Sequence, residues 1–173
     1  LISGNVNEVT YQPGMLEQWI HKYTYDADNR LSQASFTSNN ADIELGANYL
    51  YYPHGPLRRL ELGHKGIQGL DYAYTLQGWI KGLNSDILTL TNDMGGDSRA
   101  GSLNATFPRD VFGYSLHYNL NDYQAIDPNW GNSTVTDFLA KRGGDIDDTN
   151  TNLHELYNGN IASWSQTLPN TNL

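Results

Sequence analysis

Cysteine is absent from this sequence of 173 residues. Its absence excludes disulfides, thiolate metal sites and cysteine nucleophiles together. Apolar residues are also few, at 38% of the chain, and no apolar run approaches the roughly 20 residues that a helix needs to span a bilayer. We therefore expect no membrane insertion by this segment.

Basic residues are scarce as well. Ten Lys and Arg face 19 Asp and Glu, which gives a net charge of −9. A nucleic-acid-binding domain needs a basic stripe that displaces counterions from the phosphates. The paired cations Arg58-Arg59 and Lys141-Arg142 are too few to make such a stripe. The composition thus predicts no nucleic-acid partner.

Tyrosine is abundant, with 12 copies, and part of it follows a repeating pattern. Tyr-x-Tyr, a turn and then an apolar residue occur in this order at residues 23–31, 49–57 and 72–80. The copies are offset by 26 and then 23 residues. A period of this size predicts a repeat array, in which each unit buries its apolar face against the next.

Each copy also predicts a hairpin. Tyrosine, threonine and isoleucine suit a pleated, half-buried surface. Asp28-Asn29, His54-Gly55 and Gln77-Gly78 supply residues that tolerate the positive φ of tight turns. We expect the repeated residues to form stacked rungs of one sheet. These are Tyr23, Tyr25, Asp26, Leu31, Tyr49, Tyr51, Leu57, Tyr72, Tyr74 and Trp79.

The first copy carries a family resemblance. Residues 23–31, Tyr-Thr-Tyr-Asp-Ala-Asp-Asn-Arg-Leu, resemble the YD repeat Y-x-Y-D-x-x-G-R-L, with Asn29 where the family usually has glycine. Residues 51–63, 68–82, 109–116 and 156–161 are also similar to rearrangement-hotspot (Rhs) proteins of the Bacteroidetes type. The chain therefore resembles the Rhs and YD-repeat family over about two thirds of its length.

This resemblance implies an all-β fold, a stretch of a spiralling β-sheet shell with at most one or two short helices. Shells of the family close around a polypeptide, often a C-terminal toxin domain. The segment would then form part of the wall of such a shell. It would be a fragment of a longer bacterial chain that is secreted or displayed at the cell surface. Its partners would be the rest of that chain and the enclosed toxin. An adhesion or carbohydrate-binding surface that uses Trp130 and Trp164 is the alternative.

The chain divides into three stretches by composition. Repeat hairpins are expected over residues 1–90, and a Gly- and Asn-rich surface loop over 91–106. Further strands are expected over 107–173, with a short helix near 133–142 and a hairpin at 156–164 around Asn158-Gly159. Alternation over residues 110–118 places Phe112, Tyr114, Leu116 and Tyr118 on a single apolar face.

Motifs for nucleophilic or zinc chemistry are incomplete. Residues 113–117 resemble a nucleophile elbow, but His117 replaces its last glycine and the surrounding pattern is that of a strand. His154-Glu155 starts like a zinc-protease helix, yet no second histidine follows at the required spacing. A zinc site from histidines distant in sequence stays open. We expect no catalytic residue, no cofactor and no enzyme activity.

Acidic residues offer three further candidates. Residues 145–150 carry the hard oxygens of a calcium loop but lack its glycine and final glutamate, so a solvated loop is favoured. Asp26 and Asp28 suit a turn better than acid–base catalysis. Asp127 begins a sequence close to the D-P-x-G self-cleavage motif of the family, although Gly131 stands one place late. We expect no metal ligand and no self-cleavage.

Overall fold

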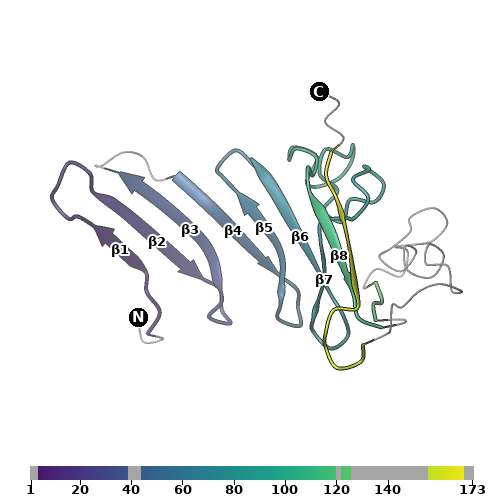
Figure 1. The fold of residues 1–173 in the computed structure, drawn as a ribbon. Coiled ribbons are helices and arrows are strands. Elements are labelled where there is room, and N and C mark those ends of the chain that lie inside the picture. The colour runs from purple at the N-terminus through teal and green to yellow at the C-terminus, as the bar shows by residue number, and fades with distance from the viewer. Residues whose placement is uncertain (1–3, 39–43, 120–121, 126–155, 170–173) are drawn as a thin grey trace, which may run out of the picture. The chain divides into compact units, whose positions relative to one another are not determined.

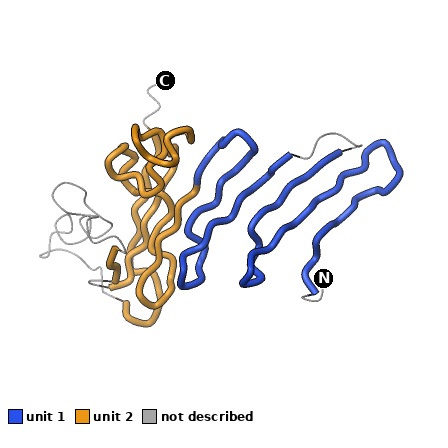
Figure 2. Tube along the Cα trace, turned by 180° about the vertical axis from the view of Figure 1, so that it is seen from behind, with its two compact units in different colours: residues 1–69 blue, residues 70–173 orange. Residues whose placement is uncertain are grey.

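The structure, a computed structural model, describes residues 4–38, 44–119, 122–125 and 156–169. These residues form β-strands, turns and loops and contain no helix, so the expectation of an all-β fold is confirmed for them. No helix that could cross a membrane occurs among them. The chain divides into two compact units, residues 1–69 and residues 70–173 (Figure 2).

Unit 1 is an antiparallel meander in which each strand pairs with the strand before it (Figure 1). Its strands are β1 (Glu8–Tyr11), β2 (Trp19–Tyr25), β3 (Leu31–Ser38), β4 (Glu44–Tyr51) and β5 (Leu57–Leu62). Aromatic and β-branched residues in these strands favour the pleated conformation.

The sheet of unit 1 is a single layer. Apart from glycine, the buried residues among those described in this unit are Thr37, Ala47 and Arg59. Most other strand side chains are half-exposed, on both faces of the sheet. Within its described residues, the unit therefore has no hydrophobic core of its own.

The same turn closes all three repeat hairpins. In the first, the N–H of Asp26 donates to the carbonyl of Arg30, and the N–H of Asn29 donates to the carbonyl of Asp26. The equivalent pairs of bonds recur over residues 52–56 and 75–79. Asn29, Gly55 and Gly78 occupy one position and have φ of 67°, 121° and 84°. The predicted positive φ is thus confirmed for the second residue of each turn pair.

A β-bulge accompanies each of these turns. The pairing register shifts at Tyr25 in the first hairpin, at Tyr51 in the second and at Tyr74 in the third. A bulge bends its strand and increases the local twist. Each repeat therefore has its register shift at the second tyrosine of its Tyr-x-Tyr pair.

Unit 2 also has an antiparallel sheet. Its strands are β6 (Gln68–Tyr74), β7 (Ile80–Leu83), β8 (Gly113–His117) and β9 (Ser163–Thr167), and the first two residues of β6 belong to unit 1. Each of β7, β8 and β9 pairs with the strand before it. Much of the chain between β7 and β8 gathers at one end of these strands (Figure 1).

Two sequence-based expectations need correction in unit 2. The loop over 91–106 is not a plain surface loop, because Asn92, Asp93 and Asp97 are buried. The turn around Gly159 exists, but the strand that follows it, β9, pairs with β8. The expected alternation is present in β8, where Tyr114 and Leu116 are half-exposed and the opposite, buried face carries the polar Ser115 and His117.

Other expectations fall outside the described residues. They concern the helix at 133–142, the acidic residues 145–150, Asp127, Trp130 and His154-Glu155.

Candidate functional site

Two of the repeat tyrosines join neighbouring hairpins. The hydroxyl of Tyr25, at the end of β2, donates to the carbonyl of Val6 at 2.8 Å. The hydroxyl of Tyr51, at the end of β4, donates to the carbonyl of Leu31 at 2.8 Å. Burial raises the pKa of Tyr51, so its hydroxyl stays protonated and able to donate. In the first two repeats, the second tyrosine of the pair thus ties its hairpin to the preceding part of the chain.

The remaining rung candidates lie at the corresponding places of the repeat. Tyr23 and Tyr49 stand two residues before these tyrosines, and all four side chains are half-exposed. Leu31 and Leu57 begin β3 and β5. In unit 2, Tyr72 and Tyr74 lie on β6 and Trp79 in the turn before β7. Their role as stacking rungs stays a prediction.

Asp26 and Asp28 form a turn with Arg30. One Asp26 carboxylate oxygen accepts the backbone N–H groups of Arg30 and Asp28, and the other accepts Arg30 Nε at 2.8 Å. The pKa of Asp26 is lowered, first by the backbone N–H of Arg30. The Arg30 guanidinium also lies 4.5 Å from the centre of the Tyr51 ring. This geometry supports the turn interpretation of the two carboxylates.

Tyr118 in unit 2 makes the same kind of bond to a backbone carbonyl as Tyr25 and Tyr51 do in unit 1. The sequence did not reveal this correspondence. Its hydroxyl donates to the carbonyl of Ile80 at 2.8 Å. Ile80 begins β7, as Leu31 begins β3. The ring centre of Tyr118 lies 5.1 Å from that of Trp79, which takes the place of Arg30 beside the tyrosine. Leu116 stands where a Tyr-x-Tyr pair would have its first tyrosine. The sequence pattern is therefore incomplete here, and it did not indicate a further repeat.

Unit 2 contains a fully buried ion pair. Nζ of Lys81, on β7, is 2.8 Å from Oδ1 of Asp122, and both side chains have no exposed surface. The other Asp122 oxygen accepts the backbone N–H of Tyr118 at 2.9 Å. Lys81 Nζ also lies 3.0 Å from Nδ1 of His117, on β8. Sequence reasoning missed Lys81 and Asp122, which lie far apart in the chain.

His117 links this ion pair to a second carboxylate. Its Nε2 lies 3.3 Å from the hydroxyl of Ser115, which is 2.9 Å from Oδ2 of Asp86. An ammonium has only donors, so the Lys81 contact makes Nδ1 of His117 the acceptor and places the ring proton on Nε2. The hydrogen bonds then run from Lys81 through His117 and Ser115 to Asp86.

This order of donors does not suit a serine nucleophile. A catalytic histidine accepts the serine proton, whereas Nε2 of His117 donates toward Ser115. Ser115 has no exposed surface and His117 is 2% exposed, so no substrate reaches the hydroxyl. The near match to a nucleophile elbow therefore brings serine and histidine into contact without forming an acyl-transfer site.

Three buried carboxylates lie together in unit 2. Oxygens of Asp71, Asp93 and Asp97 lie within 4.8 Å of one another. Asp93 accepts the backbone N–H groups of Gly96 and Asp97, and Asn84 accepts the N–H of Asp71 at 2.9 Å. Hard oxygens of this kind are ligands for Ca²⁺ or Mg²⁺. An acidic cluster alone does not identify a ligand, and we assign no ion to it.

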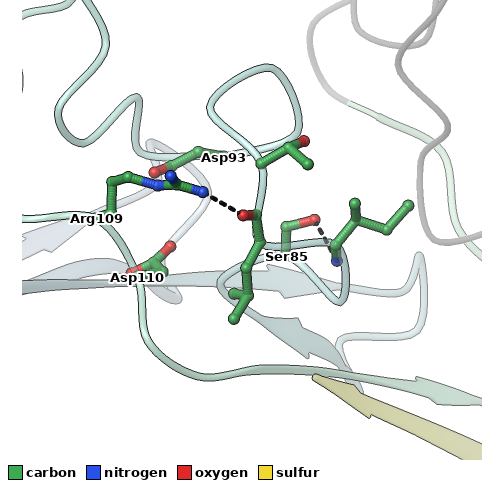
Figure 3. Close-up of a pocket in the computed structure, with 7 residues that line it drawn as sticks. Ser85, Asp93, Arg109 and Asp110 are labelled. Atoms are coloured by element: carbon green, nitrogen blue, oxygen red, sulfur yellow. Dashed lines mark hydrogen bonds between the residues drawn. The ribbon is translucent and has the colours of Figure 1, made fainter. Parts of the chain in front are cut away.

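A small cavity opens beside Asp93 (Figure 3). Its volume of about 10 Å³ is the space of one water molecule. Arg109 donates to the carbonyl of Leu88, and the Ser85 hydroxyl accepts the N–H of Ile87 (Figure 3). The cavity is thus too small for an organic substrate.

Exposed apolar side chains occur in both units. In unit 1, Met15 and Leu16 project from the turn between β1 and β2. In unit 2, the Trp164 side chain on β9 is 64% exposed, and Tyr157 is also exposed. Aromatic rings of this kind can stack on a sugar or pack against a polypeptide.

Comparison with known proteins adds no identity. No protein-family model matches the chain, and no curated protein matches it.

Proposed function

We propose that this segment is part of the wall of a YD-repeat β-shell that encloses a polypeptide, such as a C-terminal toxin domain. The shell belongs to a bacterial protein that is secreted or displayed at the cell surface, and the segment's partners are the rest of that protein and the enclosed domain. The proposal rests on the repeats of the sequence and on the single-layered sheet they form.

The observation that carries the proposal is the absence of a core among the described residues of unit 1. A single sheet whose faces are both half-exposed gains little from its own packing, because burial of apolar area is the main stabilising term in folding. Such a sheet gains most when one of its faces is covered by another polypeptide. A wall around a cargo supplies that cover and leaves the other face in water.

The connections between hairpins also support a structural role. The Tyr25 and Tyr51 hydroxyls bond backbone carbonyls, so neighbouring hairpins are tied through groups that every residue has. Ties of this kind extend a sheet by repetition.

Photo-crosslinking tests the wall proposal. A photoreactive phenylalanine analogue is placed at Tyr23 in the complete gene product, and in a matched variant at Thr24, which points to the opposite face. We expect one of the two positions to cross-link to a segment of the same protein outside the repeats, identified by peptide mass spectrometry. Cross-links from neither position, or equally from both, would contradict an enclosed cargo.

The exposed Trp164 on β9 favours one alternative, a carbohydrate-binding surface. Under this alternative the chain binds glycans on an array, and Trp164→Ala abolishes the binding. The matched control is Trp19→Ala, which removes a partly exposed tryptophan from unit 1. Equal binding by both variants and the unchanged chain would exclude Trp164 as the sugar platform.

A further inference from the structure

The buried pair of Lys81 and Asp122 has the arrangement of an amide-forming site. Nζ of Lys81 lies 2.8 Å from a carboxylate oxygen of Asp122, and neither side chain touches solvent. An amine and a carboxyl group held together react as if each were present at a very high local concentration. We propose that Lys81 and Asp122 condense into a covalent isopeptide bond within unit 2.

The dry surroundings favour this condensation. In water, an ammonium and a carboxylate are each strongly solvated, and this solvation opposes their conversion into a neutral amide. Burial removes most of that solvation from both groups. The ion pair then loses its main advantage over the uncharged product, and the released water gains the freedom of the bulk.

Two neighbouring groups supply the proton transfer and the charge stabilisation. Nδ1 of His117 lies 3.0 Å from Nζ of Lys81, so the imidazole can take a proton from the ammonium as a general base. The backbone N–H of Tyr118 donates to Oδ2 of Asp122 at 2.9 Å. This donor is placed to stabilise the negative oxygen of the tetrahedral intermediate. Asp86 faces His117 through the Ser115 hydroxyl and receives no proton in the step.

The reaction balances without a co-reactant. Nζ of Lys81, after giving one proton to His117, forms a bond to Cγ of Asp122. The bond from Cγ to Oδ1 then breaks. Oδ1 leaves as water with two protons, both of which started on the ammonium, one of them carried by His117. The product keeps one hydrogen on the amide nitrogen, and His117 returns to its neutral form.

The position of the bond gives it a structural use. Lys81 and Asp122 are 41 residues apart, so the bond closes a long loop that contains most of β7, all of β8 and the residues between them. Closing a loop restricts the unfolded chain and therefore favours the folded one. The chain has no cysteine, so a disulfide cannot serve this purpose.

Mass spectrometry of the denatured full chain tests the proposal. We expect an intact mass lower than the sequence mass by one water, and after proteolysis a branched peptide that joins the residues around Lys81 to those around Asp122. An intact mass equal to that of the sequence, with both peptides recovered separately, would overturn the proposal. The unchanged chain decides this, so the result does not depend on a variant that folds.

Variants identify the bond and its base. Asp122→Asn should form the same bond with loss of ammonia in place of water, and Lys81→Arg should form none. The control is Lys22→Arg, which alters an exposed ion pair with Glu8 and should leave the water loss intact. His117→Gln should lower the cross-linked fraction at early times after cell-free synthesis of the chain. An unchanged rate in that variant would remove His117 from the mechanism.

Discussion

The same type of hairpin turn occurs in both units, but the two units are stabilised in different ways. Unit 1 repeats one contact, a tyrosine hydroxyl on a backbone carbonyl, and has an arginine beside one of these rings, all at half-exposed positions. Unit 2 reuses the tyrosine bond and adds a buried chain of polar groups from Asp122 to Asp86. The difference shows that repeated hairpins can form a sheet while a polar network that occurs once stabilises one part of it.

The two kinds of contact also differ in how their losses combine. Separate half-exposed contacts act nearly independently, so their losses should add. Members of a buried network depend on one another, because the loss of one leaves its neighbours buried without a partner. Substitutions in unit 2 should therefore cost more than equivalent substitutions in unit 1.

The largest expected effect comes from the buried lysine. Lys81→Met leaves the Asp122 carboxylate buried without its partner, which costs about 3–5 kcal/mol. It also prevents the proposed covalent bond, so the loss should be at least this large. Urea denaturation with hydrogen exchange should show the loss in unit 2, with unit 1 unchanged. The exposed counterpart Lys22→Met should cost no more than about 1 kcal/mol. Equal losses from both variants would contradict the contrast between the units.

A substitution at one of the predicted rung tyrosines measures how much the repeated contacts stabilise unit 1. Tyr25→Ala removes a half-exposed ring and the hydroxyl bond to Val6, and should cost about 1.5–3 kcal/mol. The melting temperature of unit 1 should fall, without effect on the polar network of unit 2. Thermal stability retained in this variant would count against the rung assignment.

Close backbone packing in unit 2 supplies a third test. A Cβ on Gly113 would clash with the carbonyl oxygen of Ser85, and that backbone atom cannot rotate away. Gly113→Ala should therefore cost about 1–3 kcal/mol through forced backbone shifts. Gly46→Ala, whose nearest neighbour is the Phe36 ring at 3.1 Å, should cost less, as denaturant midpoints will show.

One hydrogen bond occurs in both units, which allows a direct comparison. Tyr118→Phe leaves the Ile80 carbonyl without its donor beside a ring that is 4% exposed, and should cost about 1–3 kcal/mol. Tyr51→Phe does the same at a half-exposed site and should cost about 0.5–1.5 kcal/mol. Burial raises the pKa of both hydroxyls, so these contributions persist below pH 10 and decline as the pH rises through the folded values. Equal costs would show that burial does not set the strength of this bond.

The smallest effect is the pH dependence of the first turn. The lowered pKa of Asp26 means that its contribution to stability is present above the unfolded value of 3.8 and is lost as the pH falls through the folded value. Asp26→Asn should remove this part of the acid transition, while Asp28→Asn should preserve it. Carbon NMR titration of the Asp26 carboxyl measures the folded pKa directly.

The sequence predicted the parts of the fold that depend on neighbouring residues. The turn positions of Asn29, Gly55 and Gly78 follow from local backbone conformation, and so do the hairpins they close. The buried network could not be predicted in this way. Lys81 and Asp122 meet only through the pairing of β7 with β8, and a lysine in an alternating strand usually points into water.

The acidic residues of unit 2 show the same limit. Asp71 and Asp93 lie in segments with no shared motif, and only the folding of the loop after β7 brings them together. Tyr118 is a different case, because its place at the end of an alternating segment matched that of Tyr51. Comparing each tyrosine with the positions of the repeat, without requiring two tyrosines, would have found it.

The meander of unit 1 also determines the order in which the unit can fold. Every strand from β2 to β5 pairs with the strand made just before it. Contacts between sequence neighbours form quickly, since only short loops must close. A chain of this kind can assemble hairpin by hairpin while it leaves the ribosome. Each strand, once formed, can then pair with the next strand that is made.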